Sequence, residues 1–167
     1  MPLRTPEGSH NVTAETARLA VALVAPLIET LWQEPRVVGS GFFYVVVMDP
    51  GLNPAVSMFE DAILYEQGFG DESSWDADYR SFARGKARLS WSHGADAHML
   101  QSLLPHSLRG GDTLLWGSVY LDGVVVGASG ALPWFDEMLA GAVALAIRAL
   151  AKEARQGELL GRAKEDE

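Results

Sequence analysis

The sequence contains no cysteine, which excludes disulfide bonds, thiolate nucleophiles and metal sites with Cys ligands. It also lacks a long hydrophobic stretch. The longest segments without a polar side chain, residues 19–28 and 138–147, have 10 residues each, whereas a bilayer-spanning helix needs roughly 20. Residues 1–12 are polar, include two prolines and lack the apolar core of a signal peptide. We therefore expect a soluble cytoplasmic protein without a membrane partner.

Basic residues are scarce as well. Thirteen Lys and Arg stand against 22 Asp and Glu, giving a net charge of −9. A surface of this sign repels a phosphate backbone, so nucleic acid is not an expected partner. The 167 residues suit one domain of ordinary size. We expect its core over about residues 13–155, followed by a flexible charged tail.

Hydrophobic periodicity and turn residues predict the order helix, two strands, helix, two strands, helix. Pro26 should kink the first helix or end its first half, because proline lacks the backbone donor. Asp122-Gly123 between two strand-like runs is the preferred type I′ hairpin turn. Residues 60–74 are expected to form a loop. The expected helices are residues 13–32, 75–91 and 134–155, and the expected strands are residues 41–48, 55–59, 113–121 and 124–129.

Short turns between consecutive strands favour an antiparallel sheet with helices packed on it, an α+β fold. The first and last helices lack a polar stripe over residues 19–28 and 138–147. A helix that is apolar all round must be covered on more than one side. Either the two helices cover each other within one monomer, or a second subunit covers them. We expect a homo-oligomer.

Several motifs follow one another along residues 13–150. A strand runs into Asp49-Pro50-Gly51-Leu52, and a later helix contains Lys86-Ala87-Arg88. Gly110-Gly111 precedes the hairpin, and Gly127-Ala128-Ser129-Gly130 leads into a helix with Asp136-Glu137 near its start. In this order the motifs resemble those of the GlcG/HbpS-like family, which includes the C-terminal domain of PduO-type corrinoid enzymes.

The resemblance implies a profilin-like α+β fold with about four to five antiparallel strands, and haem, another tetrapyrrole or a corrinoid as ligand. It also implies that Lys86 lies near the ligand pocket. The chain also departs from the family, for example at Asn53-Pro54 in the second strand and at Ala131-Leu132 in the last loop. Leu89 replaces the usual threonine, and about a dozen residues around 68–76 look inserted. No histidine lies within residues 13–32, where haem-binding members carry one.

The helix around residue 84 has a basic face. Arg80, Arg84 and Arg88 are spaced four apart and so lie on one side of the helix. Such a row can bind carboxylates or phosphates. The alternative is a solvated face paired with acids such as Asp76. Lys86 points to a different side, where it is either a ligand-binding residue or a surface lysine.

The loop of residues 127–130 precedes a helix N-terminus, where backbone amides and the helix dipole favour an anion. Gly127, Ser129 and Gly130 are therefore candidate ligand-binding residues. The alternative is a tight turn that needs glycine for its backbone conformation alone. Trp134 follows this loop, and a large aromatic side chain suits a flat, partly apolar ligand as well as a core or an interface.

Three residues are candidates for acid–base chemistry: His93, Asp49 and Asp136. His93 could serve as a general base or as an axial haem ligand. Asp49 and Asp136 could act as acid and base if the fold brought them together. Each also has a structural alternative, because His93 could be an ordinary histidine, Asp49 a turn residue and Asp136 a helix-start charge.

Three hypotheses for the function remain. The first is a ligand-binding accessory protein for a small, acidic and partly apolar molecule. The second is an enzyme that acts by acid–base chemistry on a small organic acid in a catabolic or biosynthetic pathway. The third is a structural or partner-binding module.

Overall fold

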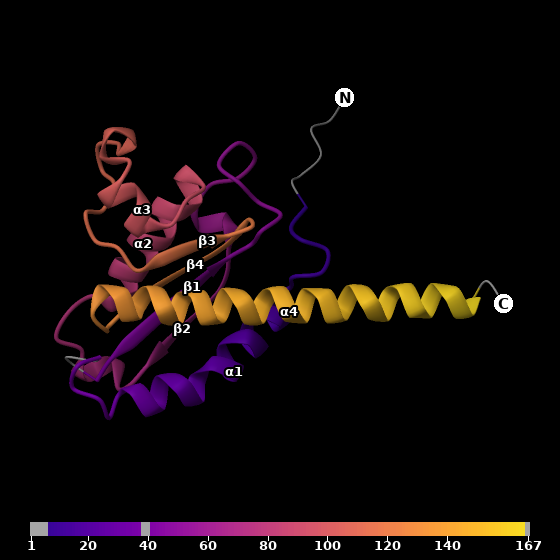
Figure 1. Ribbon diagram of the computed structural model, residues 1–167, viewed down its shortest axis with the longest axis horizontal. Coiled ribbons are helices and arrows are strands. Elements are labelled where there is room, and N and C mark those ends of the chain that lie inside the picture. Colours follow the sequence, from indigo (N-terminus) through magenta and orange to yellow (C-terminus); the bar gives the residue numbers. More distant parts are fainter. Residues whose placement is uncertain (1–6, 38–40, 166–167) are drawn as a thin grey trace.

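The computed structural model describes residues 7–37 and 41–165 (Figure 1). Its helices are α1 (Ala14–Leu31), α2 (Tyr79–His93), α3 (Ala97–Ser102) and α4 (Pro133–Glu165). Its strands are β1 (Phe43–Met48), β2 (Ile63–Phe69), β3 (Ser118–Leu121) and β4 (Val124–Ser129). Short 3-10 helices lie in the connections: η1 (Glu60–Ala62), η2 (Glu72–Ser74) and η3 (Pro105–Ser107).

The sheet is the middle of three layers. Within the described residues its strands run in the order β2-β1-β4-β3, and every neighbouring pair is antiparallel. Helices α1 and α4 pack together on one face, and α2 covers the other. The expected α+β class with an antiparallel sheet is therefore confirmed.

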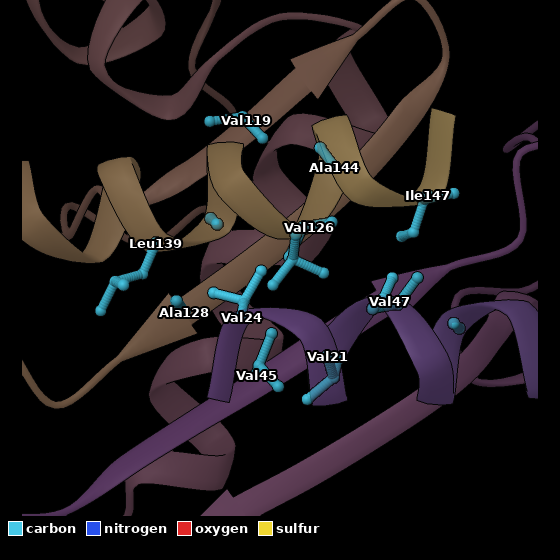
Figure 2. Packing of buried hydrophobic residues seen from close by; sticks show 14 of the residues in the cluster. Val21, Val24, Val45, Val47, Val119, Val126, Ala128, Leu139, Ala144 and Ile147 are labelled. Atoms are coloured by element: carbon cyan, nitrogen blue, oxygen red, sulfur yellow. The ribbon is translucent and has the colours of Figure 1, made fainter. Parts of the chain in front are cut away.

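Strand β1 lies at the centre of this arrangement because its side chains are apolar on both faces. Successive side chains of a strand point to opposite faces, so Val45 and Val47 pack toward α1 and α4 while Tyr44 and Val46 pack toward α2. Each buried aliphatic side chain contributes roughly 1.5–3 kcal/mol by leaving water. Figure 2 shows the first of these two cores, with side chains of α1 and α4 lying against the valines of β1 and β4.

The hairpin of β3 and β4 forms at the predicted turn. Asp122 has φ 50° and Gly123 has φ 90°, the positive values that a type I′ turn requires at both central residues. Strand β4 has the predicted bounds, but β3 begins only at Ser118.

The predicted strand at residues 55–59 is wrong. Asn53 organises a turn there, because its side chain accepts a hydrogen bond from the Ala55 amide at 2.9 Å and its carbonyl accepts one from Ser57 at 3.0 Å. The true second strand is β2, within residues that the pattern predicted as a loop. Strand β2 is a half-exposed edge strand, so it carries polar residues and lacks a clear apolar pattern.

The helices also differ in extent from the prediction. Helix α1 runs unbroken through Pro26, which lies on its exposed side. Helix α2 begins at Tyr79, capped by the side chain of Asp78, rather than at residue 75. Helix α4 continues to Glu165, so the segment expected to be a flexible tail is helical. Its ion pair between Arg155 and Glu158 has helix-stabilising i,i+3 spacing.

The two terminal helices cover each other on one side only. Their contact buries Val21 and Ile28 of α1 and Ala140 and Ile147 of α4. Leucines on their other sides remain exposed, among them Leu23 with 65% of its surface accessible. Across the described residues, no helix combines the length and the apolarity needed to cross a bilayer.

Candidate functional site

Lys86 of α2 and Asp136 of α4 form a buried ion pair. The Lys86 ammonium lies 2.8 Å from Asp136 Oδ2, and the two residues are only 4% and 1% exposed. Charged residues are almost never buried to this degree unless they are paired. The surface-lysine alternative for Lys86 is therefore wrong.

The fold brings these two side chains together through the helix face on which Lys86 lies. Ala83, Ala87 and Ser90 share this buried face, and their small side chains let α2 pack closely on β4. Gly117 leaves room for the pair, because a Cβ at this glycine would lie 2.7 Å from Asp136 Cβ and 3.2 Å from Lys86 Nζ.

The hydrogen bonds of Lys86 use all three donors of its ammonium. Besides Asp136, it donates to the Ala128 carbonyl at 3.0 Å and to Ser129 Oγ at 3.3 Å. Asp136 Oδ1 in turn accepts the Ala131 amide at 2.9 Å. The pair thus ties α2, β4 and the start of α4 together.

Asp136 has an unusual proton affinity for an aspartate. Burial raises its pKa from 3.8 to about 6, although the Lys86 ammonium and the Ala131 amide both oppose this rise. Removal from water disfavours the charged form of a carboxyl group, and here this effect exceeds the attraction of one cation. Asp136 can therefore exchange a proton close to neutral pH.

A cavity of about 390 Å³ opens directly over the pair. Its polar floor consists of Lys86, Ser129 and Asp136. Its rim is largely apolar and also includes Asp76, whose Oδ1 accepts the Tyr79 hydroxyl at 2.5 Å. The remaining lining residues are Leu115, Trp116, Gly130, Ala131, Leu132 and Pro133. Pockets for small molecules have this composition, with apolar walls and a few convergent polar groups.

Aromatic side chains lie at one side of this cavity. His98 stacks on Trp116 with ring centroids 4.5 Å apart, and Trp134 lies next to Trp116 at 6.5 Å. Trp134 is 55% exposed but does not line the cavity itself. The expected ligand-binding residue Trp134 is thus a neighbour of the wall formed by Trp116.

The arginines of α2, Arg80, Arg84 and Arg88, do not line this cavity. Arg84 makes a two-pronged contact to Glu66 at 2.7 and 2.9 Å, and Arg88 pairs with Glu60. Both arginines line a different hollow of about 320 Å³. The structure therefore shows the alternative of a paired face, although the acids come from the β2 side and not from Asp76.

Two of the three acid–base candidates lie away from the cavity. His93 Nε2 is 2.8 Å from Asp112 Oδ2, and its side chain is 4% exposed. Asp49 Oδ1 accepts hydrogen bonds from the backbone amides of Ser9 and Gly51, each at 2.8 Å. It therefore fixes the segment around Ser9 to the turn that follows β1.

Asp49 and Asp136 lie at opposite ends of β1. Tyr44 pairs with Ser129 beside the cavity, and Asp49 follows five residues later, a distance of about 16 Å in an extended strand. The two carboxyl groups therefore cannot act together as acid and base.

The glycine loop has a structural explanation. Cβ atoms at Gly127 and Gly130 would lie 2.6 Å from the Ala83 carbonyl and 2.0 Å from the Phe42 carbonyl, respectively. The nearby Ala131 and Leu132 amides already donate to Asp136 and to the Val37 carbonyl. These amides are therefore not free for an anion, although Ser129 and Gly130 do line the cavity.

The comparisons with known proteins support the fold. No family model and no curated protein sequence matches the chain. Among solved structures, the chain is similar to protein ORFY of Klebsiella pneumoniae, a DUF336 protein. The identity is 18%, the TM-score is 0.53, and the match covers 89% of this chain and 99% of ORFY. DUF336 is GlcG-like, so the fold agrees with the resemblance in the sequence motifs.

Sequence reasoning missed the cavity residues Asp76, Tyr79, Leu115 and Trp116. Lys86, Ser129, Gly130 and Asp136 of the same cavity were candidates, and Lys86 carried a further signal because it shares a helix face with Ala83, Ala87 and Ser90. A lysine among small residues on one helix face predicts that this face packs closely against another element of the fold. Trp116 and Leu115 lie in an irregular segment, and no periodic pattern indicates where such side chains point.

Proposed function

We propose that this protein binds a small molecule with a carboxylate and an apolar part in the cavity over Lys86 and Asp136. The observation that carries the proposal is the buried ion pair at the floor of an apolar-rimmed cavity of about 390 Å³. Of the described residues that line the cavity, only Lys86 is a cation, so it is the group that can hold a carboxylate. The apolar rim with Leu115, Trp116 and Leu132 contacts the remainder of the ligand.

A panel of carboxylates tests the proposal. Acetate, pyruvate, succinate, benzoate and phenylacetate are titrated by calorimetry into the wild type and into Leu132→Trp, which narrows the mouth and leaves the ion pair intact. We expect saturable binding of at least one acid with an apolar part, and at least tenfold weaker binding to the variant. Leu114→Trp is the matched control because Leu114 is 79% exposed and does not line this cavity. Failure of the whole panel, or equal binding by Leu132→Trp, contradicts the proposal.

Haem and corrinoids find no axial histidine among the described residues that line this cavity. His93 is held in a buried contact with Asp112, and His98, which stacks on Trp116, is itself not among the lining residues. A haemin titration with His93→Ala should therefore give the same Soret spectrum as the wild type, and a change specific to the variant contradicts this.

Acid–base catalysis on a small organic acid is the second candidate function. It is favoured by one observation, the pKa of about 6 of Asp136 next to the Lys86 ammonium. A general acid or base works best with a pKa near the working pH. Asp136 would exchange the proton, and Lys86 would hold the charge of the substrate. Turnover that disappears in Asp136→Asn, while ligand binding persists, distinguishes this function from binding alone.

A further inference from the structure

We infer that a carboxylate ligand enters the Lys86 cavity together with one proton, which Asp136 takes up from solvent. This inference rests on the function proposed above and specifies the protonation state in which the cavity accepts its ligand.

The first argument is that Lys86 has no free donor. Its three N–H groups are directed at the Ala128 carbonyl, Ser129 Oγ and Asp136 Oδ2, at 2.8–3.3 Å. A ligand carboxylate can contact the ammonium closely only by sharing or replacing one of these acceptors. Only one of the three, Asp136, carries a charge.

The second argument is the charge balance in the buried floor. With Asp136 ionised, the floor holds one cation and one anion, and a ligand carboxylate would add a second anion beside the same ammonium. Two carboxylates that share one site do not both stay ionised, because each raises the proton affinity of the other. A proton on Asp136 restores one cation and one anion, now Lys86 and the ligand.

The third argument is that the described residues lining the cavity hold no second cation besides Lys86. Asp76 at the rim adds a carboxyl group, which the Tyr79 hydroxyl contacts. From α4, Glu137 adds another, with His98 Nδ1 at 4.0 Å from its Oε2. Strand β4 contributes the neutral Ser129. With Lys86 as the only cation lining the cavity in the described part of the chain, a proton is the available compensation.

A protonated Asp136 also keeps its place. Its Oδ1 continues to accept the Ala131 amide, and its new O–H donates from Oδ2 to a ligand oxygen. The hydroxyl of Ser129 and the Ala128 carbonyl continue to hold the ammonium. Ligand binding therefore needs a change of partner at a single contact and no rearrangement of the helices.

Calorimetric titration with benzoate tests the inference, since benzoate stays ionised from pH 5.5 to pH 8. We expect the affinity of the wild type to fall about tenfold per pH unit above the pKa of Asp136, the slope for uptake of one proton. Titrations at pH 8 in two buffers of different ionisation enthalpy should show uptake of about one proton per benzoate bound.

Two variants distinguish proton uptake by Asp136 from proton uptake by Asp76. Asp136→Asn keeps the shape and has no carboxyl group to protonate, so its affinity should change less with pH than that of the wild type and should exceed it at pH 8. Asp76→Asn should keep the wild-type slope. Binding without proton uptake in the wild type, or a slope that Asp136→Asn retains, overturns the inference but leaves the proposed function standing. No binding of benzoate or any other panel acid by either the wild type or Asp136→Asn overturns both.

Discussion

Lys86 and Asp136 illustrate how burial changes the chemistry of ordinary residue types. Removing an ion from water costs several kcal/mol, and the attraction between partners repays this only with good geometry and satisfied hydrogen bonds. Here the Lys86 ammonium donates three hydrogen bonds, and Asp136 also accepts one from the Ala131 backbone amide. The stability of the pair therefore depends on both members being present.

Removing one member should cost more stability than removing both. We expect Lys86→Met to lower the free energy of unfolding by about 3–5 kcal/mol at pH 7, because Asp136 is left buried without its cation. The double variant Lys86→Met/Asp136→Leu should recover most of this loss. Urea denaturation measures the free energy of unfolding of both variants. Lys164→Met is the exposed control, and its free energy of unfolding should lie within about 0.5 kcal/mol of that of the wild type. A double variant as unstable as Lys86→Met would contradict this account of the pair.

The stability contribution of Asp136 should also depend on pH. Its pKa is about 6 in the folded protein and 3.8 as the reference value, so between these values the folded state binds more protons than the unfolded state. The contribution of this group is therefore complete below about pH 4 and is lost as the pH rises through 6, by up to roughly 3 kcal/mol.

Comparison with Asp136→Asn isolates this effect from the other acids. The stability of the variant minus that of the wild type should rise between pH 4 and pH 6 and then level off. Denaturation curves at intervals of half a pH unit suffice to measure it. A difference that stays constant over this range shows that Asp136 is not the titrating group.

At the scale of elements, the site exists because α2 lies unusually close to β4. Gly127 allows this approach, since a Cβ there would lie 2.6 Å from the Ala83 carbonyl and 2.7 Å from the Ala87 amide. These are backbone atoms of a helix, which cannot move aside as a flexible side chain could. The approach in turn lets Lys86 reach the carbonyl of Ala128 and the hydroxyl of Ser129.

We predict that Gly127→Ala destabilises the protein by about 1–3 kcal/mol, the usual cost of overpacking. Gly157→Ala is the matched control on α4, where no atom lies within 4 Å of the new Cβ. It should stabilise the protein by up to about 1 kcal/mol through the higher helix propensity of alanine. Thermal unfolding of both variants measures the difference, and an equal response would show that the close approach of α2 to β4 is unimportant.

At the scale of the whole molecule, the outer sides of α1 and α4 remain apolar. Leu23 is 65% exposed and Leu145 is 52% exposed, although both helices already pack on the sheet and on each other (Figure 1). Exposed apolar surface of this kind is typical of contacts between subunits.

We therefore predict self-association through this side of the molecule. Leu23→Glu should shift the protein toward the monomer in analytical ultracentrifugation and leave its unfolding temperature nearly unchanged after correction for concentration. Leu114→Glu, in the loop before β3, should leave the association state as in the wild type. A wild-type protein that is monomeric at high micromolar concentration contradicts the prediction.

Much of the fold was predictable because its strongest signals are local. Asp122-Gly123 predicts its hairpin through backbone conformation alone, and the valine run of β1 predicts a strand buried on both faces. Strand β2 was missed because most of its side chains are only half-buried, so polar residues interrupt the apolar pattern. The end of α4 was missed because charged helix formers are equally common in helices and in solvated tails.

The sequence by itself determined the class of the fold, strand β1, the β3–β4 hairpin and the identity of Lys86 and Asp136 as candidates. Only the tertiary structure decided that these two belong together, 50 residues apart in the chain, and that Arg84, Arg88, His93 and Asp49 belong to other contacts. Local patterns express backbone preference and the burial of one face, which short segments carry on their own. The pairing of charges depends on which helix face meets which strand end, and that is set only when the three layers pack.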